Sequence, residues 1–175
     1  MRYRRAVLAG GDFFFTLNLA NRQSDLLVRH VDSLRDVMRR VKAAHPFTIM
    51  AVVVLPDHLH ALWRLPPDDA GYPLRWSLIK AGFSGLIPKE ERLSASRVAK
   101  RERGIWQRRY WEHRIRDERD FARHVDYIHY NPVKHGWVRS PREWPHSSVH
   151  RYIARGELPR NWGMAPKEAL PVGER

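Results

Sequence analysis

The feature that most constrains this chain is a nearly unbroken apolar segment, FTIMAVVVL at 47–55, followed at once by a tight turn. An apolar run of this length, rich in valine, is typical of a strand buried in the middle of a sheet. Pro56 and Asp57 supply the turn, and HLHALWRL at 58–65 begins directly after it. The sequence therefore predicts a β-hairpin whose first strand is buried in the middle of a sheet.

A strand and an amphipathic helix are predicted before the hairpin. Residues 13–19 are aromatic and apolar and end at the polar stretch NRQS, as a strand would. From Ser24, which is suited to cap a helix, apolar side chains recur at steps of four, three, four and three. These side chains are Leu27, Val31, Leu34, Met38 and Val41. The pattern predicts one helix, which His45 and Pro46 stop.

The remaining elements complete an α+β order. They are a helix at about 74–86, a strand at 105–116, a helix opened by Asp117 that ends at Asn131 before Pro132, and a short helix at 147–152. This order predicts an antiparallel sheet with helices packed on one face. We expect one domain over residues 1–152 and a C-terminal tail over 153–175.

Composition narrows the class of protein. The chain has 175 residues, of which 43% are hydrophobic, so it is not a disordered basic tail. It has no cysteine, which excludes disulfides and thiolate metal ligands. Its 32 Lys and Arg against 19 Asp and Glu give a net charge of +13, which favours a polyanionic partner, nucleic acid first.

The N-terminus does not form a signal peptide, because Gly10, Gly11 and Asp12 interrupt its apolar run. No other segment is an apolar stretch long enough to span a bilayer. We therefore expect a cytoplasmic protein with no membrane partner.

The first candidate for chemistry is the pair His58 and His60. Side chains alternate along a strand, so both imidazoles project from one face and are well spaced to hold one metal ion with a third ligand from elsewhere. The other interpretation is an exposed sheet face in a basic protein with ten histidines. Asp57 beside the pair is equally explained as a turn residue.

The second candidate is Tyr127 with Asn131, one helical turn apart. A phenol oxygen can attack phosphorus, and an amide oxygen one turn away can bind the metal ion that polarises the phosphate. The alternative is structural, with Tyr127 as a core aromatic residue and Asn131 as the end of a helix before proline.

A segment rich in basic and aromatic residues is the third candidate. Single-stranded nucleic acid is held by cationic grooves and stacking aromatic rings, and this region supplies both. The predicted nucleic-acid contacts are Arg4, Arg5, Arg108, Arg109, Trp111, His113, Arg114 and Lys134. Some of these aromatic side chains belong to a core if the segment is a strand, and some of the charges only add solubility.

Three segments together resemble one known family. HLH at 58–60 follows an apolar strand, YIHYNPV lies at 127–133, and WPHSS lies at 144–148. The chain looks like the REP-associated tyrosine transposases, bacterial single-tyrosine HUH enzymes, over residues 10–152. WQRRYWEH at 106–113 is part of the resemblance. Insertion-sequence relatives often have glutamine where Asn131 stands, and asparagine looks like the REP-associated branch.

The resemblance implies roles for particular residues. His58, His60 and Asn131 would hold a divalent ion, Mg²⁺ or else Mn²⁺, and Tyr127 would be the nucleophile. The implied fold is the ferredoxin-like or RRM-like fold of these transposases. The implied partner is single-stranded DNA beside a REP-type hairpin, and the implied reaction is cleavage and rejoining through a 5′-phosphotyrosine.

Two other functions and some details stay open at this point. A non-catalytic RNA- or DNA-binding domain with an RRM-like sheet is the alternative, although the RNP aromatic pattern is absent. A metal-dependent hydrolase would need more carboxylates near the histidines than Asp57 provides. The sequence does not define the hairpin, the cleavage position, the base that activates Tyr127, or whether the protein is a monomer or a homodimer.

Overall fold

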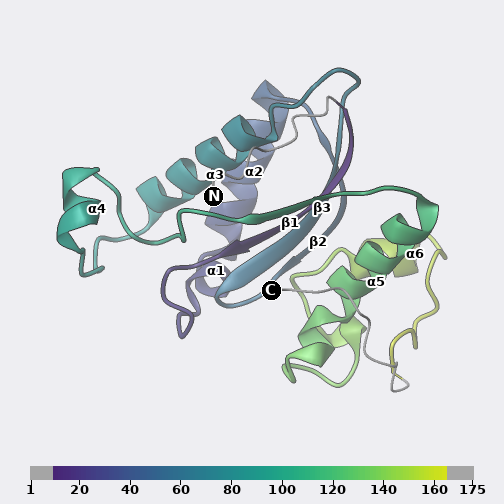
Figure 1. Cartoon of the computed structure of the whole chain (residues 1–175). Helices are drawn as coiled ribbons and strands as arrows, with labels where there is room; N and C mark the ends of the chain where they lie inside the picture. The colour runs from purple at the N-terminus through teal and green to yellow at the C-terminus, as the bar shows by residue number, and fades with distance from the viewer. Residues whose placement is uncertain (1–9, 165–175) are drawn as a thin grey trace.

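The computed structural model describes residues 10–164, and its centre is a four-stranded antiparallel sheet in the order β2-β3-β1-β4 (Figure 1). The predicted hairpin is confirmed as β2 (Thr48–Val54) and β3 (His58–Leu65). The prediction that the segment 47–55 lies in the middle of the sheet is wrong, because β2 is an edge strand, and its valines are covered by packing on its two faces and by a later segment along its edge. β1 (Gly11–Asn18) pairs with the other side of β3, and the short β4 (Trp111–Arg114) pairs with β1 at the edge. β3 is therefore a central strand, and all of its residues except Arg64 are buried.

The predicted strand at 105–116 is wrong in extent, because only Trp111–Arg114 forms β4. In the stretch before β4, backbone carbonyl groups accept hydrogen bonds from a side chain of another segment. Lys80 Nζ donates to the carbonyl oxygen of Gln107 at 2.7 Å and to that of Arg108 at 3.5 Å. These carbonyl groups point to α3 (Tyr72–Leu86). Before them the chain pairs with the β1 side only at an isolated bridge between Leu19 and Trp106, so the regular ladder with β1 is limited to β4.

The helix predicted from Ser24 is two helices, α1 (Leu26–Arg29) and α2 (Val31–Ala44), which meet at His30. The amide of Leu27 donates to the carbonyl of Pro56 in the hairpin turn at 3.1 Å. This tertiary hydrogen bond holds α1 against the turn, while α2 follows the sheet. The apolar periodicity is nevertheless correct, since Leu27, Leu34 and the other predicted apolar positions are all buried.

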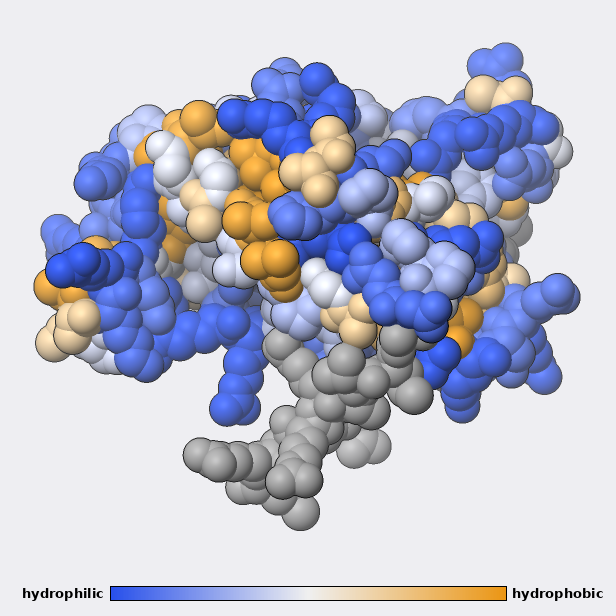
Figure 2. Space-filling view, turned by 90° about the horizontal axis from the view of Figure 1, so that it is seen from above, coloured by the Kyte–Doolittle hydropathy of each residue, from blue (hydrophilic) through white to orange (hydrophobic). Residues whose placement is uncertain are grey.

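α2 and α3 cover one face of the sheet (Figure 1). Trp63 of β3 stacks on Trp76 of α3 with ring centroids 3.9 Å apart. The two helices approach closely at Gly82, where a Cβ atom would lie 2.8 Å from a Val37 methyl group, so only glycine fits without a shift. On the face seen from above, the surface shows a group of apolar residues that is bordered by hydrophilic residues (Figure 2).

The predicted α+β class is confirmed, but the helices are not confined to one face. α5 (Glu118–Lys134) packs on the opposite face, where Phe14 and Leu62 join Val125 and Ile128 of α5 in a second apolar cluster. Alternate residues of the sheet strands thus belong to two different cores, because successive side chains point to opposite faces. The reason is the helical pattern of α5 itself, which presents apolar side chains to β2 and β3.

α5 begins as predicted, with Asp117 Oδ1 accepting a hydrogen bond from the Asp120 amide at 2.8 Å. It does not end at Asn131, because Pro132 lies inside its last turn and the helix continues to Lys134. The His135 amide still donates to the Asn131 carbonyl at 3.0 Å and closes that turn. Pro132 therefore removes one donor near the helix end without stopping the helix.

The C-terminal part of the described chain packs against β2. After α4 (Ala95–Ala99) and the 3₁₀ turn η1 (Pro141–Glu143), residues 146–148 run along the free edge of β2 before α6 (Val149–Ala154). The amide of Val54 donates to the carbonyl of His146 at 2.9 Å, and the amide of Ser148 donates to that of Val52 at 2.8 Å. The short helix predicted at 147–152 is confirmed with shifted ends. The predicted boundary between domain and tail at 152/153 stays a prediction.

No helix within residues 10–164 is long and apolar enough to cross a membrane. Arg4 and Arg5 lie outside the described residues.

The buried histidine of the α5 to α6 contact makes stability depend on pH. His129 is fully buried, its Nε2 lies 2.8 Å from Ser148 Oγ, and burial lowers the pKa of the imidazole to about 3. A folded-state pKa below the ordinary value near 6.5 means that the unfolded chain binds more protons between these two values. Stability is therefore complete above pH 6.5 and falls as the pH decreases.

We expect the free energy of unfolding to fall between pH 6.5 and pH 4, with His129 contributing on the order of 2–3 kcal/mol. Urea unfolding followed by circular dichroism at several pH values measures this. His129→Gln should be less stable at pH 7 and lose less stability on acidification, while the control His30→Gln, at the junction of α1 and α2, should follow the wild type. Equal pH dependence in wild type and His129→Gln would refute the assignment.

Candidate active site

The two histidines of β3 lie on the face that α5 covers. β3 alternates, so Leu59 and Ala61 face α2 and α3 while His58 and His60 face the other way. Both imidazoles are buried, with 3% and 0% of their surface exposed, and their ring centroids are 5.0 Å apart. The sequence placed this pair side by side correctly, but on a buried face and not an exposed one.

Each imidazole is oriented through its Nδ1 atom. His58 Nδ1 lies 2.7 Å from Asp57 Oδ1, and His60 Nδ1 lies 2.8 Å from Thr16 Oγ1 of β1. Asp57, which the sequence left open as a plain turn residue, therefore also holds a ring, and Arg22 pairs with its second oxygen at 2.8 Å. When Nδ1 is used in this way, Nε2 is the ring atom that is directed away from the partner and toward α5.

The electrostatics of the site favour a neutral imidazole at His60. Burial lowers the pKa of His60 well below its ordinary value, and the nearby positive charges of His58, His135 and Lys134 lower it further. A neutral imidazole offers a lone pair, which is the form that binds a metal ion.

Tyr127 of α5 lies directly against His60. The two ring centroids are 5.2 Å apart with an interplanar angle of 70°, and the tyrosine is 2% exposed. Lys134, which the sequence predicted as a nucleic-acid contact, donates from Nζ to Tyr127 Oη at 3.3 Å. The same ammonium group lies 4.7 Å from the centroid of the phenol ring. The phenol oxygen is thus beside a positive charge.

Asn131 lies between the two contacts that α5 makes with the histidine pair. Tyr127 contacts His60, and the His135 ring lies 5.1 Å from that of His58. Asn131 is one turn from each of these helical residues, so the three lie along one face of the helix. Its side chain is fully buried, and neither its oxygen nor its nitrogen has a hydrogen-bond partner among the residues that the structure describes.

The donor set at this place fits a divalent metal ion. His58 Nε2 is also buried without a hydrogen-bond partner within residues 10–164. Polar atoms that are buried and unsatisfied cost free energy, and here a nitrogen and an amide oxygen of this kind come from β3 and α5. Imidazole nitrogen and amide oxygen are ligands suited to Mn²⁺ and, with water, to Mg²⁺.

The predicted nucleic-acid contacts do not form one surface. In β4, Trp111 pairs with Thr16 and so lies on the face of the histidine pair, while Arg114 pairs with Phe13 on the opposite face. Trp111 is 46% exposed, as a stacking ring would be. Arg109 is exposed, whereas Arg108 is engaged with Glu102 at 2.9 Å.

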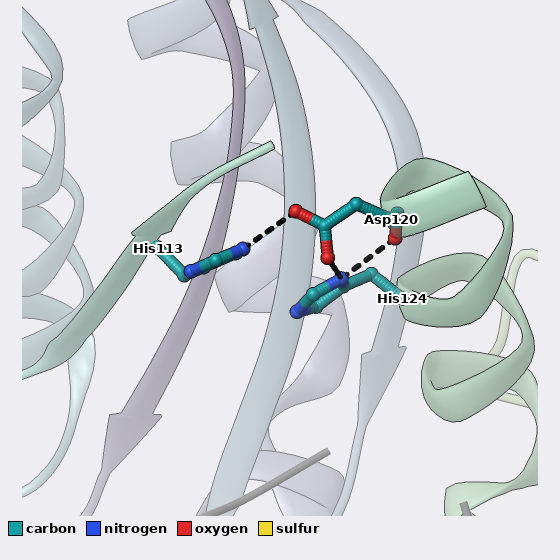
Figure 3. Close-up of side chains that lie close together, drawn as sticks. All are labelled: His113, Asp120 and His124. Carbon is teal, nitrogen blue, oxygen red and sulfur yellow. Dashed lines mark hydrogen bonds and ion pairs between the residues drawn. The ribbon is translucent and has the colours of Figure 1, made fainter. Parts of the chain in front are cut away.

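His113 belongs to a cluster that sequence reasoning missed. His113 Nε2 lies 2.8 Å from Asp120 Oδ2, and His124 lies beside the same carboxylate (Figure 3). His124 and Asp120 are one turn apart on α5, a spacing that is visible in the sequence. Their pairing with His113 of β4 is not visible in the sequence, because it depends on the register of β1 and β4, in which His113 lies opposite Phe14.

Comparisons with known proteins agree with this fold. A REP-associated tyrosine transposase of Escherichia coli (strain K12) is 45% identical over 160 residues, which are 91% of this chain and 89% of the relative. A Haemophilus influenzae protein of the same family name is 43% identical over 165 residues, 94% of each chain. No family profile matches the sequence.

A solved structure of a REP-associated tyrosine transposase bound to a REP hairpin is also similar. Its TM-score is 0.83 at 43% identity, over 100% of this chain and 98% of that chain. The fold and these relatives place the chain in the class of transposases. It belongs to the REP-associated tyrosine transposase family.

Asp57 gives a direct test of the metal site. Asp57→Ala removes the partner of His58 Nδ1, and we expect Mn²⁺ binding to weaken by roughly 10–100-fold, because outer partners orient a ligating imidazole. Isothermal titration of the purified protein with Mn²⁺ measures the affinity. Asp32→Ala, which removes an exposed carboxylate of α2, is the control. Unchanged affinity in Asp57→Ala would show that His58 is not a ligand.

Proposed function

We propose that this protein cleaves and rejoins single-stranded DNA next to REP-type hairpins, with Tyr127 as the nucleophile. The observation that carries the proposal is the arrangement of α5 on β3, with Tyr127 against His60 and Asn131 beside the same pair of buried imidazoles. Family membership supports a transposase reaction, and the similar structure bound to a REP hairpin supports hairpin DNA as the partner.

The proposed step is an exchange of phosphodiester bonds. Tyr127 Oη attacks the scissile phosphorus, the bond to the 3′ oxygen breaks, and that oxygen leaves as a 3′-hydroxyl after gaining a proton. The protein then carries the 5′ phosphate of the other fragment as a phosphotyrosine. Attack by a 3′-hydroxyl on this bond reverses the chemistry and releases Tyr127, so strands are transferred without ATP.

His58, His60 and Asn131 are the residues that would hold the divalent ion. When bound, the ion supplies Lewis-acid polarisation of the phosphate and offsets the developing negative charge. The chain's own contribution is to fix the two imidazoles through Thr16 and Asp57 and to keep that of His60 neutral by burial. It also brings the amide of Asn131 to them on the same helix that carries Tyr127.

Lys134 assists the nucleophile. An ordinary phenol ionises near pH 10, so at neutral pH the attacking oxygen must lose its proton. The ammonium group 3.3 Å from Tyr127 Oη favours the phenolate and holds it by a charge-assisted hydrogen bond. Lys134 thus acts on the reacting atom, beyond the phosphate contact that the sequence predicted.

The structure gives a reason to prefer this reaction to a non-catalytic RRM-like function. An RRM binds bases on an open sheet face through stacked aromatic side chains. Here one face is covered by α2 and α3, and the other carries α5 over Phe14 and Leu62. The nucleic acid therefore meets the margin of the sheet near Trp111 and the end of α5, not an open sheet.

The covalent intermediate is the primary test. A single-stranded oligonucleotide with a hairpin and flanking sequence, labelled at its 3′ end, is incubated with the protein and Mg²⁺ or Mn²⁺. We expect an SDS-resistant protein–DNA band that carries the 3′ label, because the 5′ phosphate becomes attached to Tyr127. A 5′ label should appear on a free fragment ending in a 3′-hydroxyl.

Tyr127→Phe should abolish the band and leave hairpin binding nearly intact, as measured by gel shift. Tyr130→Phe, three residues further along the same helix, is the matched control and should still form the adduct. An adduct in the Tyr127→Phe protein would refute the assignment of the nucleophile. An adduct formed in excess chelator would refute the requirement for a divalent metal ion.

Lys134 has its own test in the pH profile of adduct formation. Lys134→Met should slow the reaction by roughly 10–100-fold at pH 7, with partial recovery at higher pH as the phenol ionises in bulk solvent. Lys134→Arg keeps the charge and should retain more activity, and Lys100→Met controls for an exposed lysine. The same loss at every pH, removed by raising the DNA concentration, would mean that Lys134 only contacts phosphate.

A further inference from the structure

A second group of metal-type side chains lies outside the candidate active site. Among residues 10–164, His113, Asp120 and His124 each offer one ligand-type atom, and these atoms all lie within 4.8 Å of one another. They come from two elements, β4 and the first turns of α5 (Figure 3). Nothing in the proposed strand transfer uses them.

From this geometry we propose that His113, Asp120 and His124 form a second, transition-metal site that takes Zn²⁺ and fastens the start of α5 to β4. Two imidazoles and one carboxylate are a ligand set that Zn²⁺ binds in proteins. The site is distinct from the pair His58 and His60, and its test below reads metal binding alone, so it does not depend on the proposed strand transfer.

The distances bring the three side chains close to a shared ion. Zinc bonds of about 2.0–2.2 Å to nitrogen and oxygen place neighbouring ligands of a tetrahedron roughly 3.3 Å apart. In the structure His113 Nε2 is 2.8 Å from Asp120 Oδ2, and His124 Nδ1 is 3.3 Å from Asp120 Oδ1. His124 Nδ1 also donates to the backbone carbonyl of Asp120 at 2.8 Å, and the ligand-type atoms of the set lie within 4.8 Å of one another. An ion would therefore bind after His124 gives up that hydrogen bond and the imidazoles move closer by roughly an ångström.

The protonation states are also suitable. Burial lowers the pKa of His124, which keeps its imidazole neutral. Burial opposes ionisation of Asp120, but hydrogen bonds from Arg116 and His113 outweigh it and hold the pKa of the carboxyl well below its ordinary value. Zn²⁺ binds the lone pair of a neutral imidazole, whose remaining N–H lies on the other ring nitrogen, and an imidazolium must first lose a proton to solvent, so affinity should increase with pH.

The surroundings supply an outer partner and an opening. The amide of Arg116 donates to Asp120 Oδ2 at 3.1 Å and orients the carboxylate. Asp120 and His124 are buried, but the His113 side chain is 28% exposed, so water can reach the site and complete the coordination. The guanidinium of Arg116 lies 3.2 Å from the same oxygen and is a cation that would compete with a metal ion there.

An ion bound by His113, Asp120 and His124 would restrict the movement of α5 relative to β4. α5 carries Tyr127 and Asn131, and His124 lies one turn before Tyr127, with its ring 4.8 Å from that of Phe14. Phe14 in turn contacts the ring of Tyr127 at 5.9 Å. An ion that joins β4 to α5 at His124 would therefore limit movement of the helix that presents the nucleophile.

The experiment is a zinc titration of the full chain, with bound zinc measured by competition with a chromogenic chelator at pH 7.5. We expect His113→Ala to lose one bound zinc ion, or to bind it at least roughly 100-fold more weakly, compared with wild type. His58→Ala, which affects the other site, should keep that ion, and so should His150→Ala, which removes an exposed histidine. Equal numbers and affinities of zinc ions in wild type and His113→Ala would overturn the proposal.

Two further measurements distinguish the loss of a zinc ligand from misfolding of the His113→Ala variant. Arg116→Gln removes an exposed competing charge and keeps the backbone donor, so it should bind zinc at least as tightly as wild type, and weaker binding would contradict the site. Co²⁺ added to His58→Ala protein should give the visible absorption of a tetrahedral site with nitrogen and oxygen ligands. Absence of this absorption in a folded protein would also overturn the proposal.

Discussion

Two imidazoles buried in the central strand of the sheet are the constraint on which the rest of the site depends. Burial of a polar ring costs free energy unless its nitrogens are satisfied, and β3 places His58 and His60 where no solvent reaches them. One nitrogen of each ring is matched inside the hairpin or by β1, through Asp57 and Thr16. The other nitrogen of each ring is directed toward α5. The helix must therefore place polar side chains in a contact with the sheet that is otherwise apolar.

α5 meets this demand with one helical face. Its apolar side chains, including Val125 and Ile128, seal the contact with the sheet, and Tyr127 and Asn131 stand on the side of the histidines. Tyr127, the proposed nucleophile, and the amide of Asn131 are separated by one turn of a single rigid element, so their relative position is set by helix geometry and not by a loop. β3 supplies the two histidines of the site, and α5 supplies Tyr127 and Asn131. The apolar core between β3 and α5 fixes the distance between these two pairs of residues.

Much of this arrangement was predictable from local pattern. The apolar run, the turn and the alternation of 58–65 predicted the hairpin and placed His58 and His60 on one face, and the spacing of Tyr127 and Asn131 predicted a shared helical face. The second face of the sheet was not predicted, because the sequence order does not tell which side a helix takes after a long connection. The contact of Thr16 with His60 was missed, because it depends on strand register. Lys134 was predicted only as a nucleic-acid contact, and its contact with Tyr127 was missed because it depends on a helix that continues through Pro132.

The segment 146–148 has a consequence for the sheet as a whole. It forms hydrogen bonds along β2 through Val52 and Val54, and this valine-rich strand would otherwise offer an open row of amides and carbonyls to another chain. A chain that stopped before Trp144 would keep the histidine pair and the tyrosine helix but leave this edge bare. Such a truncated product would be a template for intermolecular strand pairing, so in the folded chain the segment 146–148 protects the edge of β2 against self-association.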